Sequence, residues 1–426
     1  MKDIILRGGR VIDPATHTDE VRDIFIHGGR ISSVEEVKVD AAQVIEAKGL
    51  VVAPGLIDIH VHLREPGQTS KETIETGSKA AARGGFTSIV CMPNTSPPID
   101  NAGAVEFIKA RVRDEAVVNI YPTGGITVGL EGEEMTQMGS LKRAGVVALT
   151  DDGRCVQNNE VMRRAIEYAK MFELPIMDHC QDYDLAGTGV VNEGVWSMKL
   201  GLSGWPAIAE EMIVARNCLL AEKIGWKIHC QHVSTAGSVR LLREARKRGI
   251  PIFGEVCPHH IALTDAAVQD FDTNTKINPP LRSEKDVAAL LEGIADGTLS
   301  ILASDHAPHC DYEKEVEFDD APFGIIGLET ELGLFLTLLV HKKIITLPDL
   351  ISRYTTNPAQ LLALPKGTLS AKAEADITII DPDREWTVNK EESASKSRNT
   401  PFHGWKLKGK AVATIVGGKV VFDDRA

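Results

Sequence analysis

The chain has 426 residues, a formal net charge of −13 at pH 7, and 43% apolar residues. This length accommodates one large α/β barrel with a small accessory domain, and the acidic balance argues against a nucleic-acid or anionic-membrane binder. The opening MKDIILRGGRVIDP lacks the apolar core of a signal peptide, and no run reaches the roughly 18 apolar residues of a membrane span. The seven cysteines are scattered singly, which favours reduced thiols and a cytoplasmic protein.

The two ends of the chain share a pattern that the middle lacks. Residues 1–52 contain short β-like runs separated by glycine pairs, and residues 366–426 are again β-rich with a glycine turn. We therefore predict one small β-sandwich domain that is assembled from both termini.

Residues 53–365 alternate between short apolar runs that end in polar residues and longer amphipathic stretches. Eight such units predict an α/β fold of the (β/α)8 TIM-barrel type. In such barrels the chemistry lies at the carboxyl ends of the strands, so the residues that end each run are the candidates for a site. The eight runs are Leu56–His62, Thr87–Pro93, Val117–Tyr121, Val146–Asp152, Pro175–His179, Lys227–His232, Pro251–Cys257 and Ser300–Asp305.

The first run ends in His60–Val61–His62. Because a strand repeats every two residues, His60 and His62 share one face, and Ile57, Ile59 and Val61 are expected to pack on the other face against the helices. Two imidazoles on one face at the end of a strand are typical of a metal-ligand pair.

Other run ends supply further donors. Parity favours Asp152 over Asp151 as the carboxylate that points into the barrel, and position at the tip of the run favours His232 over His229. Six nitrogen and oxygen donors at one barrel mouth suit one or two divalent ions, with zinc preferred. The predicted ligands are His60, His62, Asp152, His179, His232 and Asp305.

Asp305 also ends the last run, where a carboxylate is placed to move a proton. A metal centre lowers the pKa of water and polarises a carbonyl, and a neighbouring carboxylate can pass the proton of that water to a leaving nitrogen. Asp305 is therefore expected to act as a ligand, as a proton shuttle, or as both.

Three polar residues near these ends are candidates for binding substrate. Arg64 lies two residues after His62, and a guanidinium there suits the capture of a carboxylate, although a rim salt bridge would explain it as well. Asn94 and Asn278 would orient amide or carboxylate groups, or else cap a helix or complete a turn.

The stretch from Pro54 to Gly67, PGLIDIHVHLREPG, resembles the signature of dihydroorotases in the amidohydrolase superfamily. The resemblance spans the whole barrel and the split terminal domain. Four more stretches are similar to that family: Met92–Thr95, Ser304–His309, Lys276–Arg282 and Phe323–Thr330.

The resemblance implies the reversible ring closure of N-carbamoyl-L-aspartate to dihydroorotate in pyrimidine synthesis. It places one metal on His60 and His62, completed by Asp305 as acid and base, and a second on His179 and His232. It also implies that the substrate carboxylate is held by Arg64, Asn94 and His309, and the ring by Asn278 and the backbone of Phe323–Gly324.

The fourth run departs from the pattern of many superfamily relatives, which bridge two metals with a carboxylated lysine. In this chain Asp152 occupies the position of that lysine, and no lysine lies between Gly145 and Arg154, as in bacterial long-chain dihydroorotases.

The resemblance implies two zinc ions, a homodimer and a possible aspartate carbamoyltransferase partner. The alternatives are a hydantoinase, allantoinase or dihydropyrimidinase, or a non-catalytic scaffold for the transcarbamoylase. Residues 310–322 form a long charged loop that is either a mobile lid or a plain surface loop.

Overall fold

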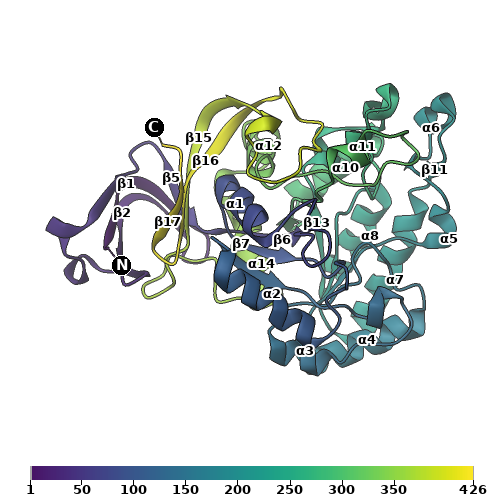
Figure 1. Ribbon diagram of the computed structural model, residues 1–426, viewed down its shortest axis with the longest axis horizontal. Coiled ribbons are helices and arrows are strands. Elements are labelled where there is room, and N and C mark those ends of the chain that lie inside the picture. Colours follow the sequence, from purple (N-terminus) through teal and green to yellow (C-terminus); the bar gives the residue numbers. More distant parts are fainter. Residues whose placement is uncertain (1, 426) are drawn as a thin grey trace.

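The computed structural model describes residues 2–425, and a closed barrel occupies most of them (Figure 1). Its regular wall strands fall into two parallel sheets, one of three strands and one of four. The first sheet contains β6 (Leu56–Val61), β7 (Phe86–Cys91) and β8 (Asn119–Pro122). The second contains β9 (Ile176–Asp178), β12 (Ile228–Cys230), β13 (Ile252–Val256) and β14 (Ile301–Leu302).

Single bridges join the two sheets into a ring. The run at residues 146–152 forms no regular strand, and it pairs through Leu149 alone, with Gly124 on one side and Ile176 on the other. On the opposite side Val61 pairs in parallel with His306, which closes the wall. The predicted eight-unit barrel fold is therefore present, with a fourth wall segment that is less regular than its sequence indicated.

Helices surround the wall and begin where the sequence supplies caps. The side chains of Thr73, Asn101 and Thr235 each accept a hydrogen bond from the first turn of the helix that follows. The main helices are α1 (Ile74–Gly84), α2 (Ala102–Glu115), α3 (Met138–Ala144), α4 (Asn159–Met171), α7 (Ile208–Ile224), α8 (Ala236–Lys247), α10 (Glu284–Ala295) and α13 (Leu347–Tyr354). Shorter elements are α5 (Tyr183–Ala186), α6 (Val195–Leu200), α9 (His259–Ala262), α11 (Asp311–Lys314), α12 (Glu331–Phe335), α14 (Thr356–Leu362), β10 (Val191–Asn192) and β11 (Gly204–Trp205).

The barrel interior corrects one expectation about the first strand. Ile57 and Ile59 pack in one cluster with Val90, Met177 and other residues from several wall strands, together with α14, and not with α1, α2 or the other long helices around the wall. The prediction of their outward packing was wrong because the pairing of β6 with β7 shifts register between Asp58 and Val61. This irregularity changes the parity of the strand, so that inward isoleucines are followed directly by inward histidines.

The terminal β domain is built from both ends of the chain, which lie together at one side of the molecule (Figure 1). All eight strands belong to one mixed sheet in which the C-terminal β15 pairs with the N-terminal β5. The buried apolar residues of both segments form one shared cluster. The strands are β1 (Ile4–Asp13), β2 (Thr18–His27), β3 (Arg30–Ser32), β4 (Gln43–Glu46), β5 (Val51–Pro54), β15 (Ile377–Thr387), β16 (Lys406–Val416) and β17 (Lys419–Asp423).

Buried threonines of the C-terminal strands fasten this domain to the barrel. Thr378 accepts a hydrogen bond from the Leu56 amide at 3.2 Å and donates to the Gly85 carbonyl at 2.6 Å, and Thr414 donates to the Ala82 carbonyl at 2.6 Å. The start of β6 and the end of α1 are thereby fixed. Within residues 2–425, no helix is long and apolar enough to cross a membrane.

Gly84→Ala should destabilise the chain, because a Cβ at Gly84 would lie 2.0 Å from the Leu328 carbonyl oxygen. A backbone carbonyl cannot move aside as a flexible side chain can. We therefore expect the free energy of unfolding to fall by about 1–3 kcal/mol. Gly103→Ala on the exposed face of α2 is the matched control, with an expected change below about 1 kcal/mol. Thermal unfolding of both variants measures the difference, and equal midpoints would contradict the packing argument.

Candidate metal centre

Six predicted donors come together at the carboxyl ends of the wall strands. All are buried, and they come from five separate segments of the wall. Their ring nitrogens and carboxylate oxygens form two overlapping groups whose members lie within 4.8 Å of one another, one of His60, His62 and Asp305 and one of His60, Asp152 and His232. His179 lies beside the second group.

The two carboxylates lie between the rings of the first strand. Asp152 Oδ1 is 3.2 Å from His60 Nε2, and Asp152 Oδ2 is 3.4 Å from His62 Nε2. Asp305 Oδ1 is 3.1 Å from His62 Nε2 and 3.5 Å from His60 Nε2. One compact set of donors therefore faces a common centre.

On the far side of Asp152, His179 and His232 face each other. His179 Nδ1 lies 2.8 Å from His232 Nε2 and 3.7 Å from Asp152 Oδ1. Asp152 Oδ1 is buried, and within residues 2–425 no group donates a well-directed hydrogen bond to it, although His60 Nε2 lies 3.2 Å away. An unpartnered carboxylate oxygen among imidazole nitrogens is costly unless a cation binds it, so this donor set fits divalent metal ions.

In three of the four rings, the nitrogen that faces away from the centre lies against another side chain. His60 Nδ1 lies 2.6 Å from Glu255 Oε1, His62 Nδ1 lies 2.9 Å from Asn94 Oδ1, and His179 Nε2 lies 2.9 Å from Gln181 Oε1. Each partner offers an acceptor, so the hydrogen of each ring is directed away from the centre. In the neutral ring a lone pair is then left on the facing nitrogen, as metal-binding histidines require.

The local electrostatics keep the two carboxylates and His232 in metal-binding form. At His60 and His179 the neighbouring carboxylates outweigh burial and raise the pKa of the ring, so these two rings give up a proton when a cation binds. Burial by itself would raise the pKa of Asp152 and Asp305, but the surrounding imidazoles outweigh it and bring both pKa values below the usual range. Burial and the neighbouring ring of His179 lower the pKa of His232 to about 3. Ionised carboxylates and neutral imidazoles are the forms that bind divalent cations.

Three residues of the site occupy the left-handed region of the backbone. The φ angles of Arg64, His232 and Asp305 are +59°, +31° and +47°. Residues with a Cβ are uncommon there, and such strain persists only where the surrounding structure enforces it. Strand periodicity identifies these residues but does not predict their backbone conformation, because each lies beyond the regular part of its strand.

A cavity of about 330 Å³ opens beside the donors. Arg64 lines it and is partly buried, yet within residues 2–425 its guanidinium forms no ion pair with a carboxylate. Arg64 Nε donates to the Pro308 carbonyl at 3.1 Å, and Nη2 lies 3.4 Å from His309 Nε2. The alternative of a rim salt bridge therefore does not describe this arginine.

The remaining predicted substrate residues line the same cavity: Asn94, Asn278, His309, Phe323 and Gly324. His309 Nε2 donates to the Phe323 carbonyl at 2.9 Å, and burial beside Arg64 lowers the pKa of His309 to about 2. The Asn278 side-chain oxygen is buried without a partner. Gly324 has φ +119°, and a Cβ there would lie 2.7 Å from the Ala307 Cβ, so a side chain would be both strained and crowded.

Sequence reasoning missed several residues that shape the site. Glu255 was detectable as a charge inside the apolar run Ile252–Val256. Gln181 gave no signal beyond its position two residues after His179. Asn399 gave none, although its amide donates to the carbonyls of Ala307 and Gly324 at 3.0 and 3.1 Å. The segment that contains Asn399 therefore stabilises the backbone at the mouth of the barrel.

The charged loop at residues 310–322 is tied down by two lysines. Lys314 Nζ donates to the carbonyls of Thr273 and Pro322 at 3.0 and 2.7 Å. Lys276 Nζ donates to two carbonyls of the loop at 2.8 and 2.7 Å. Burial lowers the pKa of Lys314 to about 7. Whether the loop moves as a lid stays a prediction.

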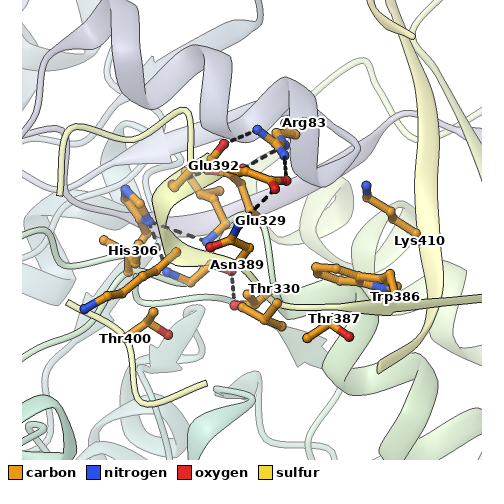
Figure 2. Close-up of a pocket in the computed structure, with 16 residues that line it drawn as sticks. Arg83, His306, Glu329, Thr330, Trp386, Thr387, Asn389, Glu392, Thr400 and Lys410 are labelled. Carbon is orange, nitrogen blue, oxygen red and sulfur yellow. Dashed lines mark hydrogen bonds and ion pairs between the residues drawn. The ribbon is translucent and has the colours of Figure 1, made fainter. Parts of the chain in front are cut away.

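A second cavity of about 180 Å³ lies between α1 and the C-terminal strands (Figure 2). Three of its charged side chains pair with one another, since Arg83 lies 3.1 Å from Glu329 and 3.6 Å from Glu392. Figure 2 shows these pairs bridging the cavity wall beside Trp386. The unpartnered donors lie in the other cavity, so we place the chemistry there.

Comparison with solved structures defines the class. The L-hydantoinase (dihydropyrimidinase) from Arthrobacter aurescens matches with a TM-score of 0.89 and 25% identity, over 100% of this chain and 97% of that chain. A dihydropyrimidinase from Brevibacillus agri matches with a TM-score of 0.87 and 24% identity. The match covers 99% of this chain and 95% of that chain. Residues 183–422 match the model of the amidohydrolase family. The fold is that of barrel amidohydrolases with an added β domain, as predicted.

Sequence relatives are more specific. Residues 49–238 match the family model described as dihydro-orotase-like. A dihydroorotase of Pelotomaculum thermopropionicum is 54% identical over 99% of both chains, and one of Geobacter metallireducens is 49% identical over 98% of this chain and 99% of its own. The chain belongs to the dihydroorotase family, which confirms the resemblance identified from its motifs.

Asp152→Asn should lower the amount of divalent ion bound by the purified protein, because it removes the charge that faces the rings of both donor groups. Metal analysis after dialysis measures this. Asp151→Asn is the matched control, since Asp151 is also buried but accepts from the amides of Ile126 and Thr127 at 2.7 and 3.0 Å. Equal metal content in the two variants would remove Asp152 from the centre.

Proposed function

We propose that this chain is a dihydroorotase that interconverts N-carbamoyl-L-aspartate and dihydroorotate plus water in pyrimidine biosynthesis. The observation that carries the proposal is the partly buried Arg64 guanidinium, which has no carboxylate partner in residues 2–425 and lines the cavity of the donor cluster. A ring that bears a carboxylate needs such a cation, whereas a neutral hydantoin does not. The names of the full-length relatives support the same activity.

A substrate panel tests this assignment. The isolated chain, supplied with zinc, is expected to hydrolyse dihydroorotate faster than dihydropyrimidine, hydantoin or allantoin. Faster turnover of a neutral ring would favour the hydantoinase alternative. No turnover alone, with activity restored to an aspartate carbamoyltransferase by adding this chain, would favour the scaffold alternative.

The donor groups suggest two zinc ions, one on His60, His62 and Asp305 and the other on His179 and His232, with Asp152 between them. Bound zinc would supply Lewis-acid polarisation of the ring carbonyl and would lower the pKa of water. The geometry that supports this is the pair of overlapping donor groups around Asp152.

Asp305 is the proton carrier in this proposal. In the hydrolytic direction a water oxygen attacks the ring carbonyl carbon and the ring C–N bond breaks. One Asp305 oxygen takes a proton from that water and returns it to the leaving nitrogen. Ring closure runs through the same steps in reverse and releases water. The low pKa of Asp305 leaves it ionised and ready to accept.

Arg64, Asn94 and His309 hold the substrate carboxylate, and Asn278 with the Phe323–Gly324 backbone contacts the ring. The free oxygen of Asn278 can accept a ring N–H. The cavity that all of these residues line supports their joint role. Orientation of this kind lowers the barrier by holding the reacting atoms together.

We also propose a homodimer in the cytoplasm. The outer surface of α7 exposes large apolar side chains, among them Met212 and Leu219 at 51% and 65%. Such a surface suits a self-contact, and seven unpaired cysteines suit a reducing compartment. Light scattering of the purified chain measures the mass.

An aspartate carbamoyltransferase partner is proposed from the family resemblance, and co-elution of the two proteins tests it.

Arg64→Met should raise KM for dihydroorotate by about ten- to a hundred-fold, because it removes charged hydrogen bonds worth roughly 1.5–3 kcal/mol. Steady-state kinetics in both reaction directions measure the effect. Arg83→Met alters the second cavity and serves as the control with unchanged KM. A normal KM for the Arg64 variant would exclude the carboxylate role.

Asp305→Ala should lower kcat by at least about 10²–10⁴-fold, since it removes both a proton carrier and a ligand. Circular dichroism is expected to stay normal, because the side chain lies at the cavity and not in the apolar core. A near-normal rate would exclude Asp305 from the mechanism.

A further inference from the structure

A carboxylate lies buried in the barrel interior beside the metal centre. Glu255 is on β13, two residues after Phe253, which packs against the interior cluster. The side chain of Glu255 is 0% exposed. Burying a charge costs several kcal/mol unless it is paired and hydrogen-bonded, so its partners indicate why it is there.

Those partners are residues of the metal centre. Glu255 Oε1 lies 2.6 Å from His60 Nδ1 and accepts from the His232 backbone amide at 3.1 Å. Glu255 Oε2 lies 2.8 Å from His229 Nε2. One carboxylate thus contacts a ring of the first donor group and the backbone of a donor in the second.

The contact with His60 differs in kind from those of the other rings. The rings held by Asn94 and Gln181 meet neutral amide oxygens, whereas His60 meets an anion. A carboxylate behind a metal-binding imidazole fixes its tautomer and strengthens the ring as a donor. His60 Nε2 is thereby directed at the carboxylates of Asp152 and Asp305.

The hydrogen bond between Glu255 and the His232 amide lies at a strained position of the backbone. His232 has a φ of +31°, which residues with a side chain rarely adopt. Its amide donates to Glu255, and this bond opposes relaxation of the loop to an ordinary conformation. The same carboxylate therefore sets a ring on one side of Asp152 and a loop on the other.

We infer that Glu255 is a positioning residue that prepares both halves of the metal centre, through the His60 ring and the His232 backbone. The inference rests on the proposed function, in which these histidines bind metal. It assigns Glu255 no contact with substrate. Loss of its charge should weaken metal binding first and turnover only as a consequence.

Glu255→Gln is the test, because it keeps the size of the side chain and removes the charge. We expect zinc affinity, measured by competition with a chromogenic chelator, to fall about 10- to 100-fold. KM for dihydroorotate at saturating zinc should change little. Glu331→Gln is the matched control, since Glu331 is equally buried but accepts from the Tyr354 hydroxyl at 2.9 Å and contacts no ligand ring.

Unchanged zinc affinity in Glu255→Gln would overturn the inference. So would a lower melting temperature of the metal-free protein with normal affinity, which would mark a purely structural role. If this variant does not fold, His229→Gln, which leaves Glu255 in place but changes its anchor, should show a smaller loss of affinity, and normal affinity there would also overturn the inference. Absence of zinc binding in the wild-type chain would instead contradict the proposed function.

Discussion

The pairing of the first wall strand with the last wall segment is the constraint on which the site depends. Val61 pairs with His306, and the His62 amide donates to the His306 carbonyl at 2.9 Å. Closer to the start of the same strand, the Asp58 carboxylate accepts a hydrogen bond from the Ser304 backbone amide. These contacts join segments more than 240 residues apart in sequence and place His62 against Asp305. Because loop closure over so many residues is entropically unfavourable, the rest of the barrel core must stabilise it.

Charge compensation inside the barrel follows from that closure. The mouth concentrates two carboxylates and four imidazoles that are all buried, and a third carboxylate lies next to them on β13. Burial opposes the ionised form of each acid, and the neighbouring rings restore it. The result is a set of donors that suits cations, beside an arginine that has no carboxylate partner within residues 2–425. Opposite charges thus occupy neighbouring parts of one cavity, which suits a substrate with both a carbonyl to polarise and a carboxylate to hold.

The terminal segments take part in this site although they lie far from it in sequence. Thr378 and Thr414 fix the start of β6 and the end of α1, and Asn399 holds the backbone around Ala307 and Gly324. The C-terminal part of the chain therefore helps to position the backbone at the barrel site. Periodicity alone could not indicate this, because Asn399 lies in an irregular stretch whose partners are set by packing.

The sequence by itself determined the barrel, the shared terminal domain and the donors at the strand ends, because apolar periodicity and strand-end chemistry are local properties of the chain. It also determined the family, through motifs that carry that chemistry. Only the tertiary structure decided that Ile57 and Ile59 face inward, because a register shift in β6 depends on its pairing with β7. Only the tertiary structure brought Glu255 and Gln181 behind the rings and left Arg64 without a carboxylate partner in residues 2–425. Such relations join distant residues, and the physical forces that set them act through space, not along the chain.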